Sequence, residues 1–462
     1  MNIIYLISDT FRYDNLFQRA SMPVNTPNLD AFSEKAASVE NVYASSFPTI
    51  PHRTDLTTAR TGWPWYPWQP LANSSNNHTP SLLKAHNYVS QLICDCPHLF
   101  KAGFQGGFDA AYQLRGQEGD MPFLRMNYPI RKTVPLEKTR PEPAPFKADC
   151  LADLHSWTNR HWRSEKDRFA RRTAATAVEW LEENYLYDPF FLWVDLFDPH
   201  EPWDPPEYMV RKYDPDYNGT PMIHPNYGRA DDYTDAELTN LRAHYCAEAE
   251  LVDRGIGRML EKIEDLGLDR NSVIVFTSDH GMSLGEHNRT GKTNINPGDE
   301  RSWPIYPEVA HIPLMIAAPN VKGGHSIQHL ALPEDILPTV AELAGLNIKP
   351  QDAVHGVSLA SQLQEKSNEE TREVVVTGNF LNKDRENIPD TATVPVVYTA
   401  EWAYVPFRPD GSAELYYLPA DPLAEKDVAE ENKEILHDMH QKFMNYLDEL
   451  EAPEETKARF SG

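Results

Sequence analysis

The sequence has little cysteine and no long apolar run. The four cysteines, Cys94, Cys96, Cys150 and Cys246, show no metal-ligand spacing, and the Cys-Asp-Cys order at 94–96 is too close for an ordinary disulfide framework. No apolar segment approaches the roughly 20 residues that a membrane-spanning helix needs. These absences exclude a disulfide-stapled scaffold, a cysteine-based metal site and a helical membrane protein.

Positive charge is also scarce. The 462 residues include 43 Lys and Arg against 69 Asp and Glu, which gives a formal net charge of −26. Surfaces that bind nucleic acids or anionic membranes are basic over a broad face, so we expect neither partner. The simplest interpretation of the acidity is solubility. A small anionic ester substrate would have to be held by local cations. Whether the protein forms a homo-oligomer is left open by the sequence.

The predicted location follows from the start of the sequence. No apolar leader precedes the first predicted strand, which begins at Asn2. A secretory signal would place a charged segment and an apolar stretch there. We therefore expect a cytoplasmic location.

Apolar strand patterns alternate with helical patterns along most of the chain. Mostly apolar runs at 1–8, 190–197 and 272–278 are typical of parallel strands that are buried on both faces. Helical patterns cover 166–185 and 235–266. This alternation predicts an α/β fold with a large, mostly parallel sheet flanked by helices.

A polar, charged run at 365–373 marks a predicted boundary between two parts of the chain. We assign 1–365 to a catalytic α/β domain and 366–462 to a smaller α+β subdomain. The second part predicts a short antiparallel sheet, closed by an amphipathic helix at 432–450. Its strands are predicted at 374–377, 394–398 and 414–418.

Two of the predicted strands end in candidate metal ligands. Asp9 follows the first strand, and Asp279 and His280 follow the strand at 272–278. In open α/β sheets, ligands bind beyond the carboxyl ends of the strands, so these side chains are aimed at one place. Taken singly, each Asp would more often cap the following helix. Together they predict a site for one divalent metal ion, with the Thr49 oxygen as a fourth protein ligand.

The segment 49–53 places a hydroxyl, a helix start and a guanidinium close together. Pro51 suits the first turn of a helix that ends near Gly62, so Thr49 lies at the N-terminus, where unpaired N–H groups stabilise an anion. Arg53 projects from the same side and adds a forked, permanently charged donor. Alone, such a segment more often contains a helix cap and a solvated arginine. Beside a metal that lowers the pKa of its hydroxyl, Thr49 is predicted to be a nucleophile.

In their order and spacing, these segments resemble the sulfatase family of the alkaline phosphatase superfamily, over nearly the whole chain. Residues 49–53 occupy the position of the family signature, and 2–9 and 276–281 those of its two metal-binding segments. The resemblance implies an alkaline-phosphatase-like sandwich and a metal-dependent ester hydrolase. Further similar segments are 26–30, 285–287 with Lys292, 312–316, 333–340 and 414–418.

Two departures from the family pattern favour phosphorus esters over sulfate esters. Sulfatases carry Cys or Ser at the position of Thr49, and that residue is converted to formylglycine, whereas threonine is not a known substrate for the conversion. An unmodified Thr hydroxyl resembles the nucleophile of the nucleotide pyrophosphatase/phosphodiesterases of the superfamily. At Thr10 most sulfatases have a second ligating Asp, while phosphonate monoester hydrolases, like this chain, have one Asp in this stretch.

The replacement of the second ligating Asp by Thr10 leaves the identity of the metal open. With one carboxylate fewer, the site is less charged, so Mn²⁺ or Zn²⁺ could fill it as well as the Ca²⁺ of sulfatases. Asp198 and His287 are candidates for a second metal, but their spacing differs from the two-zinc pattern of phosphodiesterases. We expect one divalent ion.

The resemblance also implies residues for leaving-group chemistry. His200 aligns with the family histidine that contacts the ester and can protonate the leaving oxygen, a task that suits a side chain titrating near neutral pH. Lys292 aligns with the lysine that clamps the anion. The structural alternatives are a rigid loop residue at His200 and a solvated charge at Lys292. The Pro-rich stretch 129–145 is expected to lie over the site as an ordered loop.

We therefore expect a metal-dependent hydrolase of phosphodiesters, phosphomonoesters or phosphonate monoesters that acts through a covalent phosphothreonine. A sulfatase that uses unmodified Thr49 is the alternative, since the fold is shared. A catalytically inactive binding protein is the third reading, and the joint presence of the site residues speaks against it. The expected catalytic residues are Thr49, Arg53, His200 and Lys292, and the expected metal ligands are Asp9, Thr49, Asp279 and His280.

Overall fold

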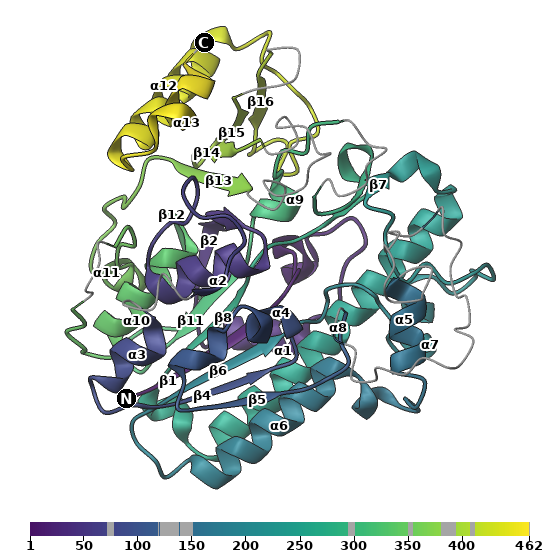
Figure 1. Cartoon of the computed structure of the whole chain (residues 1–462), viewed down its shortest axis with the longest axis vertical. Coiled ribbons are helices and arrows are strands. Elements are labelled where there is room, and N and C mark those ends of the chain that lie inside the picture. Colours follow the sequence, from purple (N-terminus) through teal and green to yellow (C-terminus); the bar gives the residue numbers. More distant parts are fainter. Residues whose placement is uncertain are drawn as a thin grey trace.

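A large sheet with helices on both faces forms the main body of the molecule, and a smaller sheet and two helices form its C-terminal end (Figure 1). The Pro-rich stretch 129–145 falls outside the described residues, apart from residue 138. Among the helices of the described ranges, none has both the length and the apolar character needed to cross a bilayer. The computed structural model describes residues 1–71, 78–118, 120, 138, 151–293, 301–349, 354–379, 394–406 and 412–461.

The large sheet has the strand order β12-β2-β11-β8-β1-β6-β4-β5. Strand β11 runs antiparallel to both neighbours, and every other pairing in this sheet is parallel. The predicted α/β fold with a mostly parallel sheet is confirmed. Its strands are β1 (Asn2–Ser8), β2 (Ala37–Val42), β4 (Val89–Cys94), β5 (Ala110–Gln113), β6 (Phe190–Leu196), β8 (Ser272–Ser278), β11 (Leu314–Ala317) and β12 (His325–Ala331).

Alternate residues of the central strand β1 pack into two separate cores. Ile4 and Leu6 belong to one apolar cluster, and Ile3, Tyr5 and Ile7 belong to the other. Because neighbouring side chains of a strand point to opposite faces, a strand that is covered on both sides is apolar without a period of two. This double burial explains the continuous apolar runs in the sequence.

Each core is closed by its own set of helices. The first face carries α1 (Pro27–Ser33), α5 (Leu151–Thr158), α6 (Phe169–Asn184), α7 (Glu207–Tyr213) and α8 (Asp235–Asp265). The second face carries α2 (Thr49–Thr58), α3 (Thr79–Lys84), α4 (Pro97–Lys101), α10 (Ile336–Leu343) and α11 (Ala360–Leu363). The helices predicted at 166–185 and 235–266 correspond to α6 and α8.

The smaller sheet combines one short strand from the N-terminal part of the chain with four strands from the C-terminal part. Its order is β16-β15-β14-β13-β3, and the four C-terminal strands pair antiparallel. The predicted antiparallel sheet is thus present in the C-terminal part, and the two-residue strand β3 extends it by pairing parallel with β13. A strand that short carries no sequence pattern. The strands are β3 (Ser46–Phe47), β13 (Val375–Asn379), β14 (Val396–Tyr398), β15 (Trp402–Val405) and β16 (Glu414–Tyr417).

The remaining elements are short, apart from one helix. Helix α12 (Lys433–Glu449) matches the predicted closing helix, whereas α13 (Glu454–Phe460), after Pro453, was not predicted. Both pack on the small sheet near the C-terminus (Figure 1). A third sheet contains β7 (Gly228–Arg229), β9 (Ser283–Leu284) and β10 (Arg289–Gly291). The short helix α9 spans Pro307–Ala310.

Gly255 of α8 lies directly against the backbone of α6. A Cβ at this position would lie 2.9 Å from the carbonyl oxygen of Ala170. We expect Gly255→Ala to lower the free energy of unfolding by about 1–3 kcal/mol, because overpacking forces the two helices apart. Urea denaturation would measure the change. Gly106→Ala is the matched control, since Gly106 is exposed and its Cβ would meet nothing within 4 Å. Equal stability of the two variants would contradict the expectation.

Candidate active site

The carboxyl ends of β1, β6 and β8 form the edge at which predicted site residues meet. Ser8, the last residue of β1, pairs with Leu196 of β6 and with Ser278 of β8. Asp9 and Asp279 therefore leave neighbouring strands at the same level, as the strand pattern indicated. The Asp9 N–H donates to the Leu196 carbonyl oxygen at 2.8 Å, which continues the register one residue past the strand.

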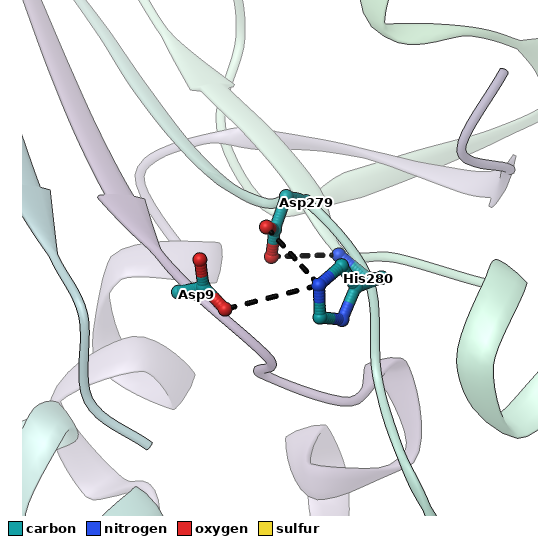
Figure 2. Close-up of side chains that lie close together, drawn as sticks. All are labelled: Asp9, Asp279 and His280. Carbon is teal, nitrogen blue, oxygen red and sulfur yellow. Dashed lines mark hydrogen bonds and ion pairs between the residues drawn. The ribbon is translucent and has the colours of Figure 1, made fainter. Parts of the chain in front are cut away.

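Asp9, Asp279 and His280 converge at this edge (Figure 2). His280 Nε2 lies 3.3 Å from Asp279 Oδ2 and 3.8 Å from Asp9 Oδ1, and all three side chains are fully buried. His280 Nδ1 lies 2.9 Å from the carbonyl oxygen of Gly281, so Nδ1 carries the hydrogen and Nε2 keeps its lone pair. This buried Nε2 has no hydrogen-bond partner among the described residues. A fixed tautomer with an orphaned lone pair between carboxylates fits a metal ligand.

Excess negative charge at the same point also favours a cation. Burial and the neighbouring Asp279 carboxylate raise the pKa of Asp9 to about 6, although Arg53, His280 and Lys292 act in the opposite direction. Buried carboxylates this close together are costly unless positive charge compensates them. The residues therefore fit a divalent metal ion, and a set of carboxylate oxygens and imidazole is compatible with Mn²⁺, Zn²⁺ or Ca²⁺.

Arg53 lies deep in the site and contacts three carboxylates. Its Nε and Nη2 bind the two oxygens of Asp195 at 3.2 and 2.8 Å, and Nη1 lies 3.1 Å from Asp9 Oδ2 and also contacts Asp279. Burial opposes the charged guanidinium, but the three carboxylates outweigh it and hold the pKa of Arg53 well above its ordinary value. The N–H groups of Arg53 are thus directed largely at carboxylates. For an anionic substrate, Arg53 would contribute its positive charge.

Asp195 is a site residue that the sequence reasoning missed. It lies within β6, is fully buried and also accepts a hydrogen bond from Trp193 Nε1 at 3.0 Å. A signal for it was present, because Asp195 is the one charged residue in the apolar run 190–197. Aspartate is almost never fully buried without a partner, so such a position predicts a buried cation nearby.

Thr49 begins α2 and is 3% exposed. One turn later, Arg53 reaches Asp9 and Asp279, so the start of this helix lies next to the predicted metal site. The helix ends at Thr58, earlier than the boundary predicted at Gly62, because Ala59 adopts a left-handed backbone conformation with φ 54°. The roles of Thr49 as nucleophile and metal ligand stay predictions.

Thr10 orients two of the predicted ligands. Its N–H donates to Asp279 Oδ1 at 2.9 Å, and its hydroxyl donates to Asp9 Oδ1 at 2.7 Å. The backbone of Thr10 is left-handed with φ 62°, which is rare for a β-branched residue. Lys292 is buried, with Nζ 3.3 Å from Thr10 Oγ1 and 3.7 Å from Glu201 Oε2. Lys292 therefore lies beside the metal site, and it is not a solvated loop charge.

His200 lies in a second buried group. Its ring stacks on Phe197 with centroids 4.0 Å apart, and its Nδ1 lies 2.7 Å from the carbonyl oxygen of Glu201. Burial lowers the pKa of His200 well below its ordinary value, the Glu201 carboxylate opposes this change, and Lys292 reinforces it. The protonation of His200 therefore depends on the negative charge around it.

The two candidates for a second metal have other contacts. Asp198 accepts hydrogen bonds from Gln117 Nε2 at 2.6 Å and from the N–H of Ala170 at 2.8 Å, so it caps the first turn of α6. His287 stacks on Tyr306 with ring centroids 3.7 Å apart. These contacts account for both side chains without a metal.

Comparison with known proteins finds relatives among sulfatases and phosphonate monoester hydrolases. A model of the family Sulfatase matches residues 1–346. An arylsulfatase from Clostridium perfringens is 23% identical over 491 residues, with 98% of this chain and 95% of the relative covered. Mouse arylsulfatase K is 22% identical over 480 residues, with 97% and 79% covered. The phosphonate monoester hydrolase of Agrobacterium radiobacter has a similar fold, with a TM-score of 0.73 and 20% identity over 97% of this chain and 96% of that chain.

The matched range covers most of the chain and includes all the expected metal ligands and catalytic residues. The large mixed sheet, the flanking helices and the smaller second sheet agree with the fold of the structural relative. The expected fold and the expected enzyme class, a hydrolase of ester bonds, are confirmed. The chain belongs to the Sulfatase family.

Proposed function

We propose that this enzyme hydrolyses phosphate esters, with Thr49 as the nucleophile and a covalent phosphothreonine as the intermediate. The observation that carries the proposal is an alcohol side chain at the buried start of α2, where sulfatases have the residue that becomes formylglycine. Because threonine is not known to be converted, its Oγ1 has to react as an unmodified alcohol. Phosphodiesters, phosphomonoesters and phosphonate monoesters are the substrate classes that suit such a nucleophile.

The charges of the site suit a small anionic ester. Asp9, Asp195 and Asp279 face Arg53 and Lys292, which leaves one negative charge in excess. A divalent ion would turn this into one positive charge. Positioned charges of this kind stabilise the charge that develops on the equatorial oxygens during phosphoryl transfer.

Each catalytic residue has a defined task in this scheme. Thr49 Oγ1 attacks phosphorus in line with the leaving oxygen, so that one P–O bond forms as the other breaks. Lys292 and the N–H groups at the start of α2 hold the equatorial oxygens, while Arg53 keeps the carboxylates in place. A divalent metal, when bound, supplies Lewis acidity and lowers the pKa of the Thr49 hydroxyl. His200 protonates the leaving oxygen, and water then releases phosphate from Thr49.

Sulfate esters are the second candidate. Two of the relatives described above are arylsulfatases, and attack of an alcohol on sulfur would use the same in-line geometry and the same cations. The charge of the site does not favour phosphate esters over sulfate esters. A protein that only binds its ligand is the third reading, against which the convergence of Asp9, Asp279 and His280 with Arg53 and Lys292 speaks.

Replacement of Thr49 by Val should abolish turnover, because Val keeps the shape of the side chain and removes the hydroxyl. We expect kcat to fall by about 10³-fold or more, as for other covalent nucleophiles, while Thr49→Ser keeps measurable activity. The measurement is hydrolysis of the 4-nitrophenyl esters of sulfate, phosphate, a phosphodiester and phenylphosphonate by metal-loaded protein. A quenched wild-type reaction should carry one phosphoryl group on the chain, and the Thr49→Val protein none.

The outcomes of this experiment separate the three readings. Thr49-dependent preference for a phosphorus ester supports the proposal, and preference for the sulfate supports the second candidate. An active Thr49→Val protein would rule out Thr49 as the nucleophile in either case. Lack of turnover with every ester and metal would favour the binding protein.

Metal removal should destabilise the folded protein. Asp9 and Asp279 repel each other across the site, so we expect chelation to lower Tm and one of Mn²⁺, Zn²⁺ or Ca²⁺ to restore it. Binding at 100 times Kd would add about 2.7 kcal/mol to the free energy of unfolding. Differential scanning calorimetry measures the effect, with Asp9→Asn and Asp279→Asn as variants.

The two variants make the interpretation specific. They remove a proposed ligand and one of the two repelling charges, so they should lose the response to metal, while Arg53 keeps its other two carboxylate partners. A metal response that persists in both variants would place the ion elsewhere.

A further inference from the structure

A second group of buried titratable side chains lies around His200. Glu118, His200 and Glu201 each offer one atom within 4.8 Å of the others. Glu118 comes from the segment after β5, and its neighbour Gln117 donates to Asp198 Oδ1 at 2.6 Å. This short segment is thus fastened at two points to the loop that carries His200. The proposed function uses His200 and leaves Glu118 without a role.

These three side chains could hold a second metal, or the two carboxylates could act on the ring electrostatically. His200 Nδ1 lies 2.7 Å from the carbonyl oxygen of Glu201, a distance at which Nδ1 must donate a hydrogen bond. A ring nitrogen that carries a hydrogen has no lone pair for a metal. Glu118 Oε2 and Glu201 Oε2 lie 3.3 and 3.4 Å from the same nitrogen, so both carboxylates face its N–H edge. The geometry favours the electrostatic reading.

Negative charge is in excess around the ring of His200. Glu118 and Glu201 carry two negative charges, whereas the positive charge of Lys292, 3.7 Å from Glu201 Oε2, is shared with Asp9 of the predicted metal site. A protonated ring would offset part of this excess. Burial, Lys292 and His98 all oppose protonation of the ring, so negative charge at Nδ1 is required for the ring to carry a proton on Nε2.

We propose that Glu118 is a positioning residue that orients His200 and favours its protonated form for departure of the leaving group. Its carboxylate acts on Nδ1, and the proton on Nε2 passes to the leaving oxygen as the P–O bond to that oxygen breaks. When water attacks the phosphothreonine, the bond between phosphorus and Thr49 Oγ1 breaks, Thr49 leaves as the alkoxide that starts the next turnover, and a proton of that water returns to Nε2. The inference rests on the proposed function and assigns a residue that acts only through its contact with His200.

The leaving-group dependence of turnover tests this role. We compare a 4-nitrophenyl ester, whose leaving group departs without protonation, with the phenyl ester of the same acid. Glu118→Gln should slow the phenyl ester by about 10²-fold and the 4-nitrophenyl ester by less than about threefold, because loss of general acid catalysis is felt only by the poor leaving group. Glu118→Asp keeps the charge and should recover part of the rate. Glu430→Gln, at a side chain that is 90% exposed, is the control for the same chemical change.

A second measurement does not depend on turnover. The ring of His200 is followed by NMR in protein labelled with ¹³C-histidine, and its signal is assigned by its loss in His200→Gln. In Glu118→Gln the titration midpoint of His200 should move to lower pH by about one unit or more, since a facing carboxylate has been neutralised. Bound metal, counted by mass spectrometry, should be the same in wild type and Glu118→Gln.

The outcomes separate this inference from the proposed function. Selective slowing of the phenyl ester with a lowered His200 midpoint supports the role of Glu118. Equal slowing of both esters, an unchanged midpoint, or loss of one equivalent of metal in Glu118→Gln would each overturn it. If no phosphorus ester is hydrolysed, the proposed function fails, while the NMR comparison still decides whether Glu118 controls the protonation of His200. If Glu118→Gln does not fold, Glu118→Asp should show smaller changes of the same sign.

Discussion

The buried guanidinium of Arg53 is the interaction on which the rest of the site depends. Strands β1, β6 and β8 each bring a carboxylate to one edge of the sheet, and three like charges in a dry interior repel one another. Arg53 binds Asp9, Asp195 and Asp279 together, so a single side chain of α2 connects the helix of Thr49 to all three strands. Removal of one partner from such a buried group typically costs about 3–5 kcal/mol.

Hydrogen bonds in the next layer fix the direction of each polar group. Thr10 aims the oxygens of Asp9 and Asp279, and the carbonyl oxygen of Gly281 sets the tautomer of His280. The carbonyl oxygen of Glu201 does the same for His200. These groups need little rearrangement when a substrate arrives, and such preorganisation is the main source of electrostatic catalysis. Thr10 therefore orders the predicted metal ligands Asp9 and Asp279.

Residues at the ends of apolar strands could be predicted from the sequence, and residues without a local pattern could not. Asp9, Asp279 and His280 were found because a buried parallel strand is easy to recognise and its carboxyl end is a known place for ligands. Glu118 lies after a short edge strand, and nothing in its neighbourhood points to His200. The pairing of β3 with β13 depends on contacts between distant segments, which leave no periodicity in either one. Strand β15, which pairs with its sequence neighbours β14 and β16, was also missed.

The parallel pairing of β3 with β13 has a consequence for how the enzyme matures. Phe47, two residues before Thr49, lies opposite Asn379 in this ladder, and the other strands of the small sheet follow still later in the chain. The described strands of the large sheet and the segments that carry Asp9, Asp279 and His280 are therefore synthesised before the partner of β3 emerges from the ribosome. The strand that leads into Thr49 thus gains this pairing only after the other segments of the predicted site have been made.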